Sequence, residues 1–177
     1  MIKKSIKDTI REHFFLSPTA KLRVRELERE LNLPLPSVIR YCKELSTEGI
    51  LRAIKAGSVN FYAADRASSQ FLLEKKLFNL RQLHECGLIE HLIREFSNPP
   101  IILFGSYAKG EDTETSDIDM YIETHSKKEA VLGKFEKLLK RKVQIMKGGG
   151  LRKIPNPHLA NNIINGITLN GYVEVFT

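Results

Sequence analysis

The sequence predicts an α+β protein built from two modules, and three observations lead to this fold class. The length of 177 residues suits two compact domains of under about 100 residues each. Residues 1–65 show helical periodicity that ends in a hairpin pattern, whereas residues 98–177 alternate between apolar strands and helices. With 42% hydrophobic and 28% charged residues, the composition is that of a globular protein rather than a disordered or membrane one.

Residues 1–65 are expected to form a helical cluster followed by a β-hairpin. Apolar residues at helical spacing predict three helices, over residues 6–16, 22–31 and 36–48. Gly49 follows the third helix and suits the left-handed conformation that often ends a helix. The hairpin consists of strands over 50–54 and 59–63 and a turn at residues 56–58. Three helices and a hairpin together make a winged helix.

The stretch Arg25–Leu51, RELERELNLPLPSVIRYCKELSTEGIL, resembles the winged helix-turn-helix domains of prokaryotic transcription regulators. This resemblance implies DNA binding, and the net charge of +7 agrees with a polyanionic partner. We expect the outer face of the third helix to enter a major groove and the hairpin to contact backbone phosphate. The residues expected at DNA are Ser37, Arg40, Tyr41 and Lys43 on the helix and Lys55 near the hairpin tip. The alternative is a winged helix that contacts only protein.

Residues 66–97 are interpreted as a helical linker together with the first helix of the second module. Gly87 suggests a break in this helical stretch. Leu73, Leu77 and Leu80 are expected to pack onto the neighbouring modules. The alternative is that these leucines form a short interface between two copies of the chain, which would make the protein a homodimer. A coiled coil, however, needs more heptads than are present.

Residues 98–177 begin with a feature that suits phosphate binding. The continuous apolar run Ile101–Phe104 predicts a buried strand that leads directly to Gly105 and Ser106. Glycine allows the backbone to approach a phosphate closely, and the residues up to Lys109 can open a helix with free N–H groups. An ordinary strand-to-helix turn is the alternative interpretation.

Two aspartates follow on the next predicted strand. Asp117 and Asp119 alternate with apolar residues, which places both carboxylates on one face, about 7 Å apart along the chain. Two neighbouring carboxylates repel each other, and burying them at the edge of a sheet is costly unless a cation neutralises them. The pair therefore predicts a site for a hard metal ion such as Mg²⁺, bound together with triphosphate oxygens.

The segment Phe104–Glu123, FGSYAKGEDTETSDIDMYIE, resembles the signature of the DNA polymerase beta superfamily, particularly its minimal nucleotidyltransferases. The resemblance implies a small fold with a mixed β-sheet flanked by helices. It also implies Mg²⁺ or Mn²⁺ as cofactor and a nucleoside triphosphate, most simply ATP, as substrate. The residues implied are Gly105, Ser106 and Lys109 at the nucleotide, and Asp117 and Asp119 as metal ligands and catalytic residues.

One position departs from the pattern of that superfamily, in which a later strand supplies a third carboxylate. A helix predicted over 128–139 leads into a strand over 141–146, where the expected position holds Gln144. Glutamine cannot act as a base, and a catalytic ion would lose one negative charge of support. Nucleotide binding is therefore expected to be better preserved than turnover. Glu123 and Glu174 are the alternative sources of the missing charge.

The resemblance implies a macromolecular acceptor, as in minimal nucleotidyltransferases that attach adenylate to a partner protein of the toxin type. A different class of function stays open, in which a degenerate nucleotide site serves as the sensor of a DNA-binding regulator. With no apolar run approaching about 18 residues, the chain is expected in the cytoplasm rather than in a membrane. The basic cluster of the last third is interpreted as a solvated face or a phosphate-binding surface. Its members are Lys134, Lys137, Lys140, Arg141, Lys142, Lys147, Arg152 and Lys153.

Overall fold

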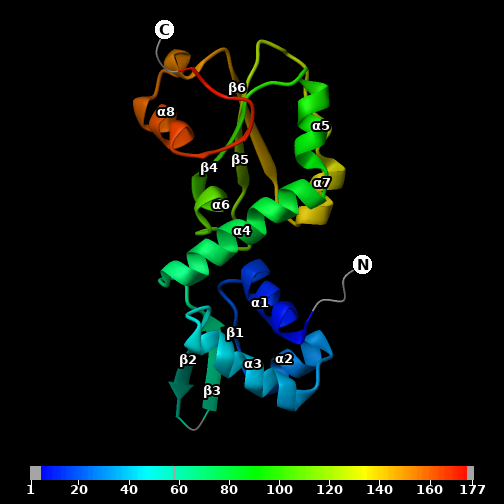
Figure 1. The fold of residues 1–177 in the computed structure, drawn as a ribbon, viewed down its shortest axis with the longest axis vertical. Coiled ribbons are helices and arrows are strands. Elements are labelled where there is room, and N and C mark those ends of the chain that lie inside the picture. Colours follow the sequence, from blue (N-terminus) through cyan, green and yellow to red (C-terminus); the bar gives the residue numbers. More distant parts are fainter. Residues whose placement is uncertain (1–4, 58, 175–177) are drawn as a thin grey trace. The chain divides into compact units, whose positions relative to one another are not determined.

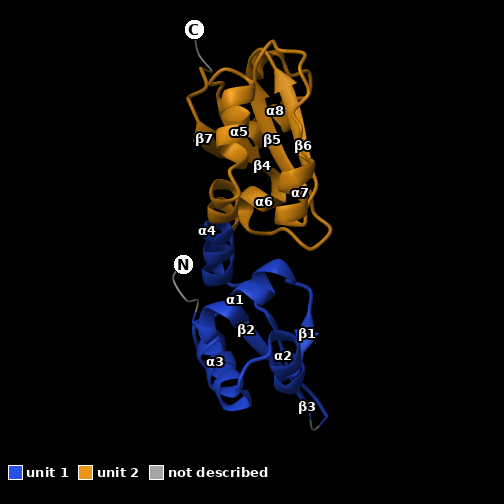
Figure 2. Cartoon of the chain, turned by 90° about the vertical axis from the view of Figure 1, so that its right-hand side faces the viewer, with its two compact units in different colours: residues 1–78 blue, residues 79–177 orange. Residues whose placement is uncertain are grey.

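The computed structural model describes residues 5–57 and 59–174, and the chain divides into two compact units, residues 1–78 and 79–177 (Figure 2). The first unit contains helices and a small antiparallel sheet, and the second contains a mixed sheet covered by helices (Figure 1). Among the described residues, no helix combines the length and the apolar character that a membrane crossing requires.

The first unit follows the predicted order of helices and hairpin, with one additional strand. Its elements are α1 (Ile6–Leu16), β1 (Lys21–Leu22), α2 (Val24–Leu31), α3 (Leu35–Thr47), β2 (Leu51–Ala56) and β3 (Val59–Ala64). The strands form an antiparallel sheet in the order β1-β3-β2. The core of this unit gathers Phe14 of α1, Leu27 of α2, Leu45 of α3 and Leu51 of β2, all buried. The hairpin turn was predicted at residues 56–58, of which Ser58 lies outside the described residues.

The prediction of a helix over 22–31 is wrong at its beginning. Leu22 lies in β1, opposite Tyr62 of β3, and the helix begins only at Val24. The reason is local, because Arg23 is extended and its backbone N–H donates to the Glu26 carboxylate 2.7 Å away, which fixes the helix start. Leu22 packs against the same core from the strand, so its apolar character fitted either element.

The end of α3 agrees with the prediction made for Gly49. This glycine has a φ of +73°, and the N–H of Ile50 donates to the carbonyl of Leu45 at 2.9 Å. The left-handed turn redirects the chain from α3 into β2. The long helix α4 (Ser69–Glu85) then contributes Phe71 and Phe78 to the core of the first unit. On this helix Leu73 and Leu77 are about half exposed, and both roles proposed for them stay predictions.

The second unit is built around a four-stranded mixed sheet. Its further elements are α5 (Leu88–Glu95), β4 (Ile101–Phe104), α6 (Gly105–Lys109), β5 (Ile118–Glu123), α7 (Gly133–Leu139), β6 (Val143–Gly148), the 3-10 helix η1 (Leu151–Lys153), α8 (Pro157–Ile164) and β7 (Ile167–Asn170). The strand order is β6-β5-β4-β7, with β5 parallel to β6 and the other pairs antiparallel. The expected position of the aspartates at a sheet edge is therefore wrong, because β5 is an inner strand.

The predicted helix over 128–139 is also shorter than expected, since α7 begins only at Gly133. The carbonyl of Lys128 accepts a hydrogen bond from Lys147 Nζ at 2.7 Å and the N–H of Lys128 is bonded to Ser126 Oγ, which are contacts of a loop. The apolar anchors of the short helix, Phe135 and Leu139, both lie within its last two turns. The strand that follows begins at Val143, two residues later than predicted.

The two faces of this sheet carry cores of different size. Ile118, Met120 and Ile122 of β5 face the larger core, which includes residues of α5 and α7. The alternate residues face the smaller core, which combines Tyr121 with Leu151 of η1 and Ile163 of α8. Asp119 has the same parity as Tyr121 and therefore lies on the side of the smaller core.

Candidate functional site

The site begins where β4 passes directly into α6. Gly105, the first residue of α6, has a φ of +75°, a conformation that side chains with a Cβ rarely adopt. A Cβ at this position would lie 2.5 Å from Asp119 Oδ2, so the space is also closed to any larger residue. The close approach follows from strand pairing, since Phe104 is opposite Asp119. The carboxylate of Asp119 therefore lies against the backbone that carries Ser106.

The two aspartates lie together at the beginning of β5. Asp117 immediately precedes the strand and Asp119 is its second residue, and both side chains are half-buried. Burial raises the pKa of Asp119 above its ordinary value, and the nearby charge of Asp117 raises it further. The ionised pair is thus held at an electrostatic cost, which a bound cation would offset.

Gln144 completes this group from the neighbouring parallel strand. It is the register partner of Asp119, and its Nε2 donates a hydrogen bond to Asp117 Oδ2. The residue predicted to replace a third carboxylate therefore contacts one of the two aspartates. Its amide group occupies an oxygen of Asp117 with a neutral donor instead of adding a negative charge.

The two glutamates considered as substitutes do not join this group. Glu123 ends β5, four residues beyond Asp119, which corresponds to about 13 Å of extended strand. It lines a separate pocket of about 350 Å³ together with Glu174 and Gly171. The structure therefore brings the two glutamates to one place, away from the aspartates.

Two pockets flank the aspartates. One, of about 490 Å³, adjoins Asp119 and has mainly apolar walls, formed by Phe104, Ile145, Met146 and Leu159 together with Gln144. The other, also of about 490 Å³, adjoins Asp117 and includes Lys137, Lys140 and Lys142. Asp119 therefore adjoins a mainly apolar pocket, whereas Asp117 adjoins a pocket lined by lysines together with Glu114 and Glu136. Lys109, predicted at the nucleotide, is exposed on α6.

The loop that carries Asp117 is held by a buried acid that sequence reasoning missed. Asp112 is 1% exposed and accepts a hydrogen bond from Asn79 Nδ2 at 2.7 Å. The same amide nitrogen donates to the carbonyl of Tyr107 at 2.9 Å. Arg141 Nη2 lies 4.0 Å from Asp112 Oδ2, and its side chain is nearly buried. Assigning Arg141 to an exposed basic face was therefore wrong, and no local signal distinguished Asp112 from the other acids of its loop.

The donor set suits one cation better than two. In the described ranges, no group of three or more His, Cys, Asp or Glu side chains is placed to hold a metal ion. Mg²⁺ is commonly bound by one or two carboxylates together with substrate phosphates. Asp117 and Asp119 provide two carboxylates of that kind, and the backbone of Gly105, which has no side chain, lies directly against Asp119. The residues present therefore fit a cation that arrives with a polyphosphate.

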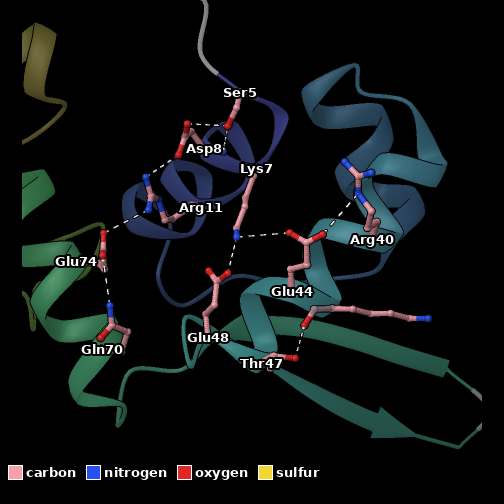
Figure 3. A network of polar contacts seen from close by, with 11 residues as sticks. Ser5, Lys7, Asp8, Arg11, Arg40, Glu44, Thr47, Glu48, Gln70 and Glu74 are labelled. Atoms are coloured by element: carbon pink, nitrogen blue, oxygen red, sulfur yellow. Dashed lines mark hydrogen bonds and ion pairs between the residues drawn. The ribbon is translucent and has the colours of Figure 1, made fainter.

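Some of the residues predicted to contact DNA are only partly exposed to solvent, and Arg40 already has partners within the unit. Arg40 and Lys43 of α3 are exposed, whereas Ser37 and Tyr41 are half-buried. Arg40 lies over the Tyr41 ring, 4.4 Å from its centroid, and pairs with Glu44 at 3.6 Å. Glu44 also pairs with Lys7 of α1 at 3.5 Å, so Arg40 is part of a charge network within the unit (Figure 3). Lys55 is exposed on β2.

Comparison with known families finds a match in the second part of the chain. Residues 85–166 match the family model described as nucleotidyltransferase domain. The matched segment contains Gly105, both aspartates and Gln144, and it confirms the nucleotidyltransferase part of the resemblance. No curated protein and no solved structure matches the chain. The match supports a general nucleotidyl transfer function and does not extend to the first unit.

Proposed function

We propose that this protein transfers AMP from ATP, with Mg²⁺ or Mn²⁺, to a macromolecular acceptor, and that its first unit binds DNA as a winged helix. The observation that supports the transfer is the convergence of Gly105, Asp117 and Asp119 at one end of the sheet, inside the segment that matches a nucleotidyltransferase domain. ATP and DNA are both available in the cytoplasm, where we place the protein.

Each residue has a distinct role in this proposal. Asp117 and Asp119 hold the divalent cation, which neutralises phosphate charge when it is bound. Gly105 and Ser106 contact the triphosphate, because the absence of a side chain at Gly105 brings backbone within reach of it. Lys109, exposed on the same short helix, adds positive charge on the phosphate side. The apolar pocket beside Asp119 offers a surface for the nucleoside.

The acceptor is proposed to be a protein partner of the toxin type, on the strength of the resemblance to minimal nucleotidyltransferases. The pocket beside Asp117 gives this proposal a place for the acceptor, since it shares no lining residue with the apolar pocket beside Asp119. Its lysines, Lys137 and Lys140 among them, would favour an acceptor hydroxyl that lies near acidic groups.

A second candidate is favoured by one contact. The hydrogen bond from Gln144 to Asp117 occupies a carboxylate oxygen and supplies no third negative charge. A site of this kind can bind Mg-ATP through two carboxylates without activating an acceptor hydroxyl. The protein would then be a DNA-binding regulator whose second unit senses nucleotide.

Incubation with Mg²⁺ and α-labelled ATP, with and without extract of the host cells, separates the two candidates. Transfer of label to a protein band that depends on Asp119 supports the transferase. Metal-dependent ATP binding without label transfer, in the presence of extract, supports the sensor. If ATP binds equally well after removal of divalent metal, the site assignment is wrong for both.

A further inference from the structure

The first unit contains a cationic pocket that the predicted DNA-binding residues do not include. The pocket has a volume of about 520 Å³ and lies between the beginning of α2 and the beginning of β3. Three arginines line it, namely Arg23, Arg25 and Arg29, and Asn60 lines it from the hairpin. We propose that this arginine pocket binds the phosphate backbone of duplex DNA, an inference that rests on the proposed DNA binding of the first unit.

The geometry of α2 aims two of the arginines in the same direction. Arg25 and Arg29 are separated by four residues, so they are neighbours on one face of the helix, with Cβ atoms about 5–6 Å apart. The opposite face of the helix carries the buried Leu27. Because that side chain is fixed in the core, the helix cannot rotate the arginines away from the surface.

Among the described residues, the lining of the arginine pocket contains three arginines and one acid. Glu26, the acidic residue of the lining, accepts from the backbone of Arg23 at 2.7 Å and pairs with the Arg23 side chain at 3.9 Å. In the part of the chain that the structure describes, Arg25 and Arg29 form no ion pair with an acid. Both guanidinium groups are exposed and available to an external anion.

The hairpin adds to the same surface from a second element. In the described ranges β1 pairs with Ala63 and Tyr62 of β3, so the stretch from Val59 to Asn60 stays open on that side. Asn60 is directly opposite Lys55 in the hairpin, and directly opposed residues place their side chains on one face of a sheet. Lys55 therefore extends the cationic surface along the hairpin, which projects away from the helices (Figure 1).

A comparison with α3 shows why phosphate, rather than a base edge, is the ligand that these arginines suit. On α3, Arg40 pairs with Glu44 and lies over the ring of Tyr41, so its guanidinium group already has partners within the unit. Arg23 makes contacts of the same two kinds, with Glu26 and with the ring of Phe61, so the contrast with Arg40 rests on Arg25 and Arg29. The arginine pocket also spans two elements instead of presenting one narrow helix face. Cations spread in this way match a repeating polyanion, and backbone phosphates contribute most of the salt-dependent affinity for DNA.

The test measures the salt dependence of binding to a fluorescently labelled random-sequence duplex by anisotropy, using the full chain. Each phosphate contact contributes about −0.9 to the slope of log affinity against log salt concentration. We expect Arg25→Ala with Arg29→Ala to reduce the slope by about 2 and to weaken binding equally on unrelated sequences. The variant Arg25→Lys with Arg29→Lys should keep the slope, because it keeps both charges.

A matched control removes the same charge elsewhere, through Arg81→Ala with Arg94→Ala, two exposed arginines of the second unit. This control should leave the slope unchanged. The proposal is overturned if the parent binds DNA and the Arg25 and Arg29 alanine variant keeps its slope, since the arginines are then a solvated surface. It is equally overturned if the lysine variant loses the slope. If the parent binds no duplex at all, DNA binding by the first unit fails together with the arginine pocket.

Discussion

Acidic residues lie at both ends of β5, and their surroundings differ. At its beginning, Asp117 and Asp119 share space with the backbone of Gly105 and with the amide of Gln144. At its end, Glu123 lines a pocket with Glu174, and Glu123 Oε2 is shielded from solvent without a hydrogen-bond partner among the described residues. A pair of acids is therefore not sufficient to identify a site. The beginning of β5 differs because the backbone of Gly105, which has no side chain, lies against the carboxylate of Asp119.

The largest expected effect comes from removing the two aspartates at the beginning of β5. Asp117→Ala combined with Asp119→Ala should weaken metal-dependent ATP binding by about 10²-fold or more, because two charged contacts of about 1.5–3 kcal/mol each are lost. Glu123→Gln combined with Glu174→Gln is the matched change at the other end and should leave ATP affinity unchanged. Titration calorimetry with and without Mg²⁺ measures both. Equal loss in the two double variants would mean that the ends are not functionally distinct.

The second prediction concerns Gln144, which stands where a third carboxylate is expected. Gln144→Asp should raise kcat for nucleotidyl transfer by about 10²- to 10⁴-fold, the usual contribution of a general base, with little change in ATP affinity. The larger effect on kcat follows because the third carboxylate acts mainly in the transition state.

The control for this prediction is Gln144→Asp in an Asp119→Ala background, where no gain is expected. A labelled-ATP assay is sensitive enough to follow both variants. If the substitution is neutral while the parent already transfers nucleotide efficiently, another residue supplies the charge and the role assigned to position 144 is wrong.

A third prediction concerns Gly105, whose backbone lies against Asp119. Gly105→Ala should destabilise the fold by about 1–3 kcal/mol, because alanine is strained at a positive φ and its Cβ would displace Asp119. ATP binding should fall with it. Gly133→Ala is the matched control, since a Cβ there meets no atom within 4 Å at the first residue of α7, and it should not destabilise the fold. Urea unfolding of the two variants measures the contrast, and similar stabilities would contradict it.

The smallest effect is a dependence of stability on pH. The pKa of Asp119 is raised in the folded state by burial and by Asp117, so its ionisation opposes folding. This penalty is absent below the ordinary Asp pKa of about 3.9 and develops as pH rises through the raised pKa. Without Mg²⁺, Asp119→Asn should therefore be more stable than the parent at pH 7, and the difference should shrink as the pH is lowered. A constant difference between pH 7 and pH 4 would rule out ionisation of Asp119 as its cause.

Local features of the sequence predicted most of what surrounds these acids. The apolar run of β4 and the alternation of β5 follow from periodicity, which is a property of neighbouring residues. The attention to Gln144 came from the resemblance to the DNA polymerase beta superfamily, and its position beside Asp119 agrees with it. The features that could not be predicted depend on distant partners. Lys21 and Leu22 form a strand because Tyr62 and Ala63 lie beside them, and the Lys128 carbonyl is bound by Lys147 instead of continuing a helix. Asp112 is recognised as structural only when Asn79 and Arg141 are seen beside it.

That buried acid also decides where the chain can be divided. Asn79, which donates to Asp112, lies in α4, within the stretch interpreted as a helical linker together with the first helix of the second module. A shortened chain of residues 98–177 would retain every candidate catalytic residue but would lose this donor and the Leu83 and Leu92 side chains of the core. Its Asp112 would be left in an apolar interior with one partner fewer, and the loop that carries Asp117 would lose an anchor. The smallest fragment that keeps the second unit intact should therefore begin before Asn79 rather than at β4, the first strand of that unit.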